Sequence, residues 1–391
     1  MKAQPDQAAI RELTIVYIAV FSICAGAGVV TPMIPLYARS LGASYVEIGL
    51  IGASYAIIYM SLAIPLGILS DRIGRRAVIA ASGSLCGVAS ILYLLAGSVN
   101  HLILIRAIEG IAWCSFWSSI EALTTEISGP LSAGKAMGLS TASYGAGSLI
   151  GGLLSGLIVA CFGFRATFVL YLVLSTITAL LAVTIREERS SKRDVKVART
   201  LSSPPLTRDR TTLVVACAVS ATYAIALGIV LTLLPVYAEG LGMETFWIGV
   251  LFATFWLGRI ISFICAGQVS DKVGRKVILA PALVGNAVAS LLVALSREIV
   301  LLSGAILIMG ISIGATFPVT IALISDVVPA SRRGAAMGLF EASAGLGMFI
   351  GPAVGGVIAE IFDPRYPYFL CTFISGVCAL VVLAHSRKFT A

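Results

Sequence analysis

The chain has 391 residues, of which 58% are hydrophobic and only 12% are charged, and its mean hydropathy is +1.00. Soluble globular domains are about half apolar and about a quarter charged, so a water-soluble fold of this size could not hide so much apolar surface. The net charge of +8 does not indicate nucleic-acid binding, because the basic residues sit in short segments between apolar runs and form no basic face.

Twelve apolar runs are long enough to cross a bilayer, whose core of about 30 Å needs about 20 helical residues. Such runs must be helices, because lipid offers the backbone no hydrogen-bond partner. In chain order the expected spans are 13–37, 46–66, 77–97, 102–123, 136–161 and 166–185, then 211–237, 246–266, 277–295, 299–323, 335–359 and 368–384. The expected fold class is therefore an all-α membrane protein with 12 transmembrane helices.

Lysine and arginine gather on one side of the predicted spans, which sets the orientation in the membrane. The other side carries only Arg39, Arg165, Arg297 and Arg365. Both termini and the central segment are therefore predicted to be cytoplasmic, in a multi-pass protein of the cell (plasma or inner) membrane.

The two halves of the sequence repeat with an offset of 200 residues. Eleven of the eighteen positions from 134 to 151 are identical at 334–351. Residues 1–189 and 211–391 are thus expected to form two pseudo-symmetric six-helix bundles, joined by a charged, proline-containing cytoplasmic linker at 190–210. Parallel repeats are expected of a transporter whose site lies between two rocking halves, although a purely architectural duplication is the alternative.

The loop after span two reads Gly-Ile-Leu-Ser-Asp-Arg-Ile-Gly-Arg-Arg at 67–76, and the loop after span eight reads Gly-Gln-Val-Ser-Asp-Lys-Val-Gly-Arg-Lys at 267–276. Both resemble the G-x-x-x-D-(R/K)-x-G-(R/K)-(R/K) loop of the major facilitator superfamily, and the overall pattern is closest to its drug:proton antiporter-like branch. The resemblance implies a loop that contacts the other half and latches one conformation.

Residue types in this loop indicate how it is built. Gly67 and Gly74 allow tight turning and close helix approach, and Asp71 could cap a helix N-terminus. We expect Arg75 to pair with Glu126, as Arg275 would with Asp326, unless the charges merely fix the topology. The expected latch residues are Gly67, Asp71, Arg72, Gly74, Arg75 and Glu126, with Gly267, Asp271, Gly274, Arg275 and Asp326.

Span four carries charge inside an apolar run. Arg106 and Gly110 resemble the superfamily's R-x-x-x-G pattern, but the second half has Ile306 at the equivalent of Arg106, so this charge is not part of the shared architecture. Glu109 is its natural partner and a possible proton carrier. The alternative is that Arg106 snorkels to the interface.

Aromatic and acidic residues continue the same face of span four. A charged and tryptophan-bearing stripe is costly against acyl chains, so it should face the interior or an aqueous cavity. At about 100° per residue, that stripe comprises Arg106, Trp113 and Trp117, with Glu109 and Glu121 within about 60°. The alternatives are that the tryptophans pack in the core and that Glu121 is a residue of the cytoplasmic mouth.

Spans five and eleven are rich in glycine. Span eleven resembles the glycine–proline motif that antiporters of this superfamily carry in their span five. In this chain, span five has Gly152 where that motif has proline. Small residues let helices pack backbone to backbone, and proline bends a helix. The expected helix-packing residues are Gly147, Gly151, Gly347, Gly351, Pro352, Gly355 and Gly356.

Two more intramembrane charges have no counterpart in the other half. Arg259 in span eight is equivalent to Tyr59, and Glu341 in span eleven is equivalent to Thr141. Placing a charged side chain near the bilayer centre costs about 3 kcal/mol, so each of these residues should have a partner or a purpose. Their depths are compatible with pairing. Trp256 beside Arg259 is a candidate second aromatic wall.

Neither a metal site nor an enzyme is expected. The eight cysteines form no CxxC pair and lie in or beside apolar runs, and the two histidines, His101 and His385, have no nearby ligand partners. No nucleotide-binding motif or nucleophile elbow is present. We therefore expect no cofactor, with a proton gradient as the energy source.

These features predict a secondary active transporter that works by alternating access as a monomer in the lipid bilayer. The first hypothesis is proton-coupled export of lipophilic, aromatic or cationic small molecules. The alternative is an importer or facilitator of a sugar, metabolite or organic anion, which Gly152 and the buried arginines favour. A non-transporting membrane receptor would need a soluble domain that the sequence lacks.

Overall fold

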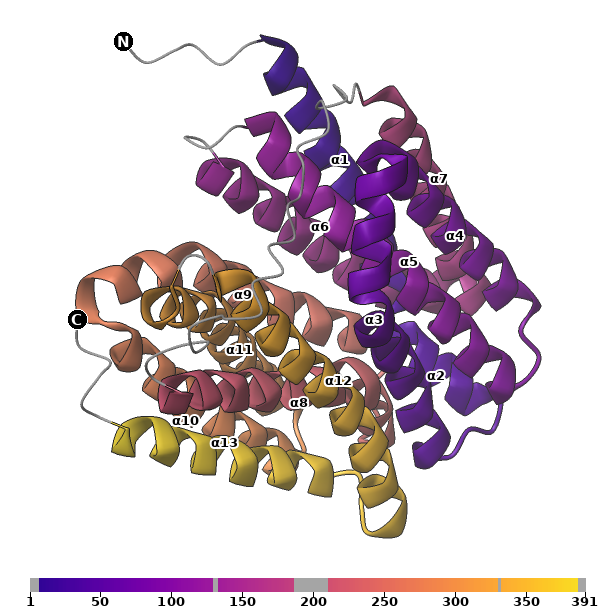
Figure 1. Ribbon diagram of the computed structural model, residues 1–391. Coiled ribbons are helices and arrows are strands. Elements are labelled where there is room, and N and C mark those ends of the chain that lie inside the picture. The colour runs from indigo at the N-terminus through magenta and orange to yellow at the C-terminus, as the bar shows by residue number, and fades with distance from the viewer. Residues whose placement is uncertain (1–6, 129–132, 186–209, 330–331, 386–391) are drawn as a thin grey trace.

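The computed structural model describes residues 7–128, 133–185, 210–329 and 332–385 (Figure 1). Within those ranges the chain forms helices and no β-strand, and 12 helices are long and apolar enough to cross a membrane. The predicted all-α fold with 12 spans is therefore confirmed. The expected linker lies outside the described residues except for Arg210, where the second half begins.

Each half places its helices in one bundle (Figure 1). The first contains α1 (Gln7–Val30), α2 (Met33–Ser40), α3 (Tyr45–Ile73), α4 (Arg75–Leu95), α5 (Val99–Ser128), α6 (Ala133–Phe162) and α7 (Phe164–Thr184). The second contains α8 (Arg210–Gly240), α9 (Thr245–Val273), α10 (Arg275–Leu295), α11 (Ile299–Val327), α12 (Arg333–Ile361) and α13 (Tyr366–Ala384).

The first span is interrupted, which the hydropathy pattern does not predict. It consists of α1 and α2, separated at Thr31 and Pro32, whereas its counterpart α8 is continuous through Pro235. The difference follows from a second proline, because the second half has Thr232 where the first has Pro32. Two prolines within one turn remove two backbone donors, and the helix breaks where a single proline is tolerated.

The halves meet where α3 packs against α12 and α6 packs against α9. On α6, Gly138, Gly145 and Gly152 recur every seven residues and so share one helix face. A methyl group added to Gly152 would lie 3.3 Å from Ala253 N in α9, and Gly145 also abuts α9, but Gly138 has no such neighbour within 4 Å. Helices α6 and α9 therefore touch along one part of their length and diverge along the rest.

The symmetry-related crossing of α12 and α3 diverges in the same direction. A methyl group on Gly345 would lie 2.8 Å from Met60 of α3, whereas one on Gly338, a heptad earlier, would meet nothing within 4 Å. At the far end of the crossing, a methyl on Gly356 would lie 3.1 Å from Gly49 Cα, and Tyr45 N donates to Glu360 Oε2 at 2.7 Å.

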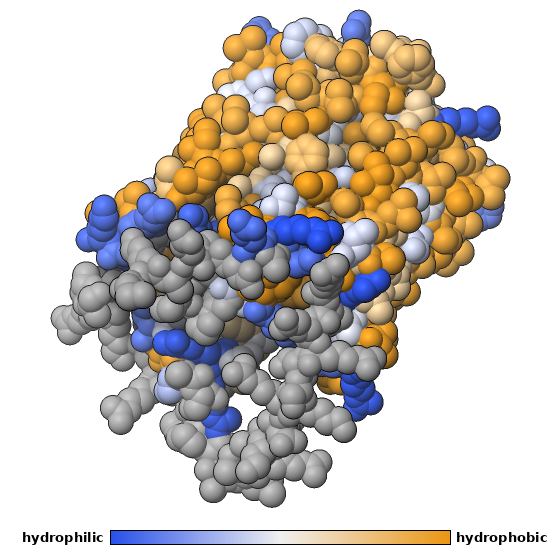
Figure 2. Space-filling view, turned by 90° about the horizontal axis from the view of Figure 1, so that it is seen from above, coloured by the Kyte–Doolittle hydropathy of each residue, from blue (hydrophilic) through white to orange (hydrophobic). Residues whose placement is uncertain are grey.

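We call the end of the molecule that carries the two loops at 72–76 and 272–276 the basic end. Both crossings are closed at the opposite end and separated toward the basic end. Figure 2 shows an apolar flank, with hydrophilic side chains gathered around one end of the described surface. The structure is thus that of a bilayer-embedded pair of bundles, closed on one side only.

Replacing Gly156 with alanine tests the closed crossing. The added methyl would lie 2.7 Å from Phe246 Cα in α9, and overpacking of this kind costs about 1–3 kcal/mol. Gly138→Ala is the matched control, because it changes the same helix at a position with open space. In thermal unfolding in detergent followed by circular dichroism, we expect Gly156→Ala to melt lower than wild type and Gly138→Ala to melt at least as high. Equal melting of the two variants would contradict the tight crossing.

Candidate functional site

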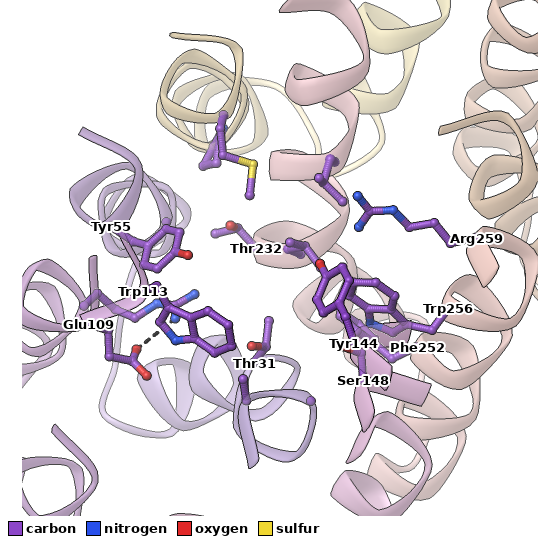
Figure 3. Close-up of a pocket in the computed structure, with 18 of the residues that line it drawn as sticks. Thr31, Tyr55, Glu109, Trp113, Tyr144, Ser148, Thr232, Phe252, Trp256 and Arg259 are labelled. Carbon is purple, nitrogen blue, oxygen red and sulfur yellow. Dashed lines mark hydrogen bonds and ion pairs between the residues drawn. The ribbon is translucent and has the colours of Figure 1, made fainter. Parts of the chain in front are cut away.

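A cavity of about 150 Å³ lies between the two halves. Both bundles contribute to its wall, and Figure 3 shows their side chains facing one another across it. From the first half it is lined by Ala27, Gly28, Thr31, Gly52, Tyr55, Arg106, Glu109, Trp113, Trp117, Tyr144 and Ser148. From the second it is lined by Leu227, Leu231, Thr232, Phe252, Trp256, Arg259, Met348 and Pro352.

A buried ion pair forms one side of the cavity. Arg106 Nη1 lies 2.9 Å from Glu109 Oε2, and the exposed fractions of these side chains are 13% and 2%. Tyr93 donates to the same carboxylate oxygen at 2.6 Å, while the Arg106 guanidinium lies 5.0 Å from the centre of the Tyr55 ring. The expected partnership is present, and Arg106 does not snorkel away from it. The pair cancels its own charge within the cavity wall.

Aromatic rings form a continuous contact across the cavity, from one half to the other. Trp113 lies 6.3 Å from Trp117, which meets the edge of Tyr144 at 5.1 Å. Tyr144 on α6 in turn meets Trp256 on α9 at 4.9 Å. The predicted tryptophan stripe of span four therefore faces the cavity, and Tyr144 joins it to the aromatic wall of the second half (Figure 3).

Arg259 occupies the second side of the cavity. Its side chain is buried, and its guanidinium lies 4.9 Å from the ring centre of Trp256 and 5.1 Å from that of Phe263. Within the described residues Arg259 makes no ion pair, and its Nε has no hydrogen-bond partner. The pairing with Glu341 that their depths suggested is thus not formed here. Stacking on two rings, one turn to either side on α9, holds the cation instead.

Glu121 and Glu341 lie outside the cavity wall. Both residues are exposed, and they belong to different halves, on α5 and α12. They interact electrostatically with each other and with Tyr59. Their position is consistent with a mouth toward the basic end, which is one of the two roles considered for Glu121.

Sequence reasoning overlooked several residues of this site. Tyr144 and Tyr93 have Ala344 and Val293 at the equivalent positions, so the comparison of halves that isolated Arg106 would have found them. Tyr55 could not be found this way, because its equivalent is Phe255 and the aromatic character repeats.

The glycine motifs pack the helices that surround the cavity. Gly147 and Gly151 press α6 onto α1, and Gly347 and Gly351 press α12 onto α8. Gly355 contacts α8 side chains, and Gly356 contacts α3 of the other half. Pro352 wedges between α3 and α8 at the cavity wall, whereas Gly152, its equivalent, leaves α6 without this ring.

The two loops have the same residue spacing in both halves, and each forms an ion-pair cluster at the basic end. Arg75 contacts Glu126 at 2.8 Å and Asp71 at 3.0 Å. In the second half Arg275 contacts Asp326 at 2.9 Å and also pairs with Asp271. Both expected pairs are present, and each joins residues of a single half. Arg72, another expected latch residue, is exposed.

Two expectations for these loops are wrong. Gly67 makes no turn, because α3 continues through it to Ile73; Gly267 likewise lies within α9. The chain turns at Gly74 and Gly274, whose φ values of +102° and +95° only glycine adopts readily. Asp71 does not cap α4, since it is held by Arg75 four residues on.

Comparison with known proteins identifies the family. A family model described as Major Facilitator Superfamily matches residues 16–299 and 248–389. The chain belongs to the Major Facilitator Superfamily. This superfamily member is a membrane-embedded transporter of small molecules and not an enzyme.

Relatives with similar sequences include an MFS-type transporter and two resistance proteins. An uncharacterized MFS-type transporter of Methanocaldococcus jannaschii is 26% identical over 95% of this chain and 97% of its own length. The class B tetracycline resistance protein of Escherichia coli is 33% identical over 42% of this chain and 41% of its own. The multidrug resistance protein MdtG of Proteus mirabilis is 30% identical over 41% and 42%. Similarity to the two resistance proteins therefore spans less than half of each.

Solved transporter structures share the fold. The nucleoside transporter NupG superposes with a TM-score of 0.80 at 16% identity, over 96% of this chain and 100% of its own. A bacterial homologue of the human lysosomal transporter Spinster gives 0.79 at 14% identity, over 99% and 98%. These likenesses show that the chain shares the fold of these transporters.

Removing the charge of Glu109 tests the buried ion pair. Glu109→Gln leaves the Arg106 guanidinium without its anion, and breaking a buried pair costs about 3–5 kcal/mol, less where a cavity admits water. We expect a lower melting temperature in detergent than for Glu121→Gln, the same change at an exposed position of α5. The double variant Arg106→Met, Glu109→Gln should recover part of the loss. Equal melting temperatures for the two single variants would contradict the interaction.

Neutralising Arg75 separates a structural from a conformational role for its loop. Both acidic partners are more than half exposed, so Arg75→Gln should lower the free energy of unfolding by less than about 1 kcal/mol. If the loop is a latch, the initial transport rate in proteoliposomes should nevertheless fall severalfold. Arg165→Gln, at an exposed position in the opposite connection, serves as the control. An unchanged rate in Arg75→Gln and in Arg275→Gln would rule out the latch.

Proposed function

We propose that this chain is a secondary active transporter of the cell (plasma or inner) membrane that exports lipophilic aromatic molecules in exchange for protons. The observation that carries the proposal is the cavity between the halves, whose aromatic wall runs from Trp117 through Tyr144 to Trp256. Rings of this kind stack on planar apolar substrates. The cavity is complete within one chain, which supports a monomer as the working unit.

The divergence of the halves supports alternating access. Because α3/α12 and α6/α9 are closed at one end and apart at the other, a rocking motion about the glycine crossings would reverse which end is open. The separated end is the basic end, which the distribution of lysine and arginine predicts to be cytoplasmic. A cavity that is open in this direction can exchange molecules with the cytoplasm, which export requires for loading and import for release.

Carboxylates near the basic end are the candidates for proton coupling. Glu121 and Glu341 stand on opposite halves and already interact electrostatically. Closing the basic end would bring them closer, and two carboxylates at short range repel each other unless one carries a proton. Glu109 is a weaker candidate, because it is committed to Arg106 and Tyr93.

Import or facilitated diffusion is the second candidate, and one observation favours it. The antiporter motif of span five lacks its proline, since Gly152 faces α9 where the equivalent Pro352 wedges against α3. The two crossings therefore differ. Because the antiporter motif is incomplete, import, or transport that is not coupled to protons, would not conflict with it.

Reconstitution with an imposed pH gradient tests the function. Proteoliposomes would be given aromatic dyes, aromatic acids and sugars, with accumulation followed by fluorescence or radiolabel. We expect aromatic compounds, and no sugars, to move in the direction opposite to the proton flow. Glu341→Gln and Glu121→Gln should uncouple this movement, and Glu298→Gln, an exposed carboxylate outside the interface, should not.

The outcomes separate the candidate functions. Movement of aromatic compounds that ignores the pH gradient would favour facilitation. Movement in the same direction as protons would favour import. Coupled export that survives both carboxylate substitutions would exclude Glu121 and Glu341 as proton carriers, and absence of any aromatic transport would overturn the proposal.

A further inference from the structure

We propose that Arg259 is an anion-binding residue of the cavity, and that the substrate carries an acidic group next to its aromatic ring. The inference rests on the proposed transport function and specifies the charge of the molecule that is moved. It stands on the position of Arg259, on the charge balance of the cavity wall and on the aromatic groups around the guanidinium.

The charge balance of the wall leaves one cation uncompensated. Among the described residues that line the cavity, the charged side chains are Arg106, Glu109 and Arg259. The first two form an ion pair at 2.9 Å, so their charges cancel. Arg259 is 94% buried, as its exposed fraction of 6% shows, and makes no ion pair within the described residues. An anion entering the cavity would find one unsatisfied positive charge there.

The direction of the Arg259 side chain makes it available to a ligand. Figure 3 shows the guanidinium reaching from α9 into the space between the halves. Its Nε is buried without a hydrogen-bond partner. A guanidinium presents its donors in a planar fork that matches carboxylate, sulfonate and phosphate oxygens. Tyr144 is a neutral hydrogen-bond partner of the guanidinium, so the buried group that faces the cavity still has an unpaired Nε–H and no anion.

The rings around Arg259 specify the rest of the substrate. Trp256 stacks on the guanidinium at 4.9 Å and meets Tyr144 at 4.9 Å, so the cation lies at one end of the aromatic bridge. Stacking fixes the plane of the guanidinium, and the Nε–H on its edge has no hydrogen-bond partner. A ring bound along the bridge would place an attached anionic group at Arg259. Arg106 cannot do the same, since Glu109 occupies it.

Three naphthalene ligands that differ only in their head group test the inference. Naphthalenesulfonate is permanently anionic, naphthalenesulfonamide is neutral and naphthyltrimethylammonium is cationic. Equilibrium binding of the radiolabelled compounds to the purified full-length chain in nanodiscs measures affinity. We expect the sulfonate to bind more tightly than the sulfonamide, and the trimethylammonium compound to bind most weakly.

Substitution of Arg259 assigns the preference to this residue. Arg259→Gln should weaken sulfonate binding about ten- to a hundredfold, as expected for a charge-assisted pair, and change sulfonamide binding less than about twofold. Arg259→Lys should fall between, because lysine keeps the charge without the fork. Arg297→Gln, at an exposed position between α10 and α11, is the matched control and should bind like wild type. Size-exclusion profiles confirm that each variant is folded.

Each result bears on a different proposal. Equal wild-type affinities for sulfonate and sulfonamide, or an equal loss of both in Arg259→Gln, would overturn the anion-binding role and leave Arg259 a packing residue. If Arg259→Gln does not fold, the Arg259→Lys variant and the wild-type ligand series still decide. Failure of all three naphthalenes to bind or to be transported would instead contradict the proposed aromatic substrate.

Discussion

The two bundles approach each other through glycine, and the rest of the molecule depends on this close contact. At Gly49, Gly156 and Gly356 backbone lies against backbone, where α3 crosses α12 and α6 crosses α9. Larger side chains at these positions would hold the two backbones apart. Pro352, which packs against Gly49 and Gly52 of α3, also lines the cavity, so the contact between the halves and the cavity wall share residues.

The ion pairs of the described residues form within single bundles, and charges without an opposite partner remain between the bundles. The clusters around Arg75 and Arg275 close within single halves, as does the Arg106–Glu109 pair. Arg259 alone among the charges of the described cavity wall has no acidic partner, and Glu121 and Glu341, on different halves, interact electrostatically as like charges. Ion pairs within a half therefore stabilise its bundle. The charges between the halves are left to interact with molecules that enter the cavity.

Local signals carried most of the fold and part of the site. Hydropathy and the offset of 200 residues predicted the spans, and a spacing of three on a helix predicted the Arg106–Glu109 pair. The break at Pro32 was missed because hydropathy measures how apolar a run is and does not register where a proline interrupts the helix. The stacking of Arg259 between Trp256 and Phe263 was readable from helical spacing. Contact of Tyr144 with Trp256 was not, because it depends on how α6 crosses α9.

The distribution of tryptophan has a consequence for how this transporter can be observed. Of the 4 tryptophans in the sequence, Trp113, Trp117 and Trp256 line the cavity, and Trp247 is exposed near the start of α9. The intrinsic ultraviolet emission of the protein is therefore weighted toward the space between the halves. Binding of a molecule in that space, and entry or loss of water there, both alter the surroundings of these indoles. The chain thus contains its own optical reporter of the transport cycle, without an added label.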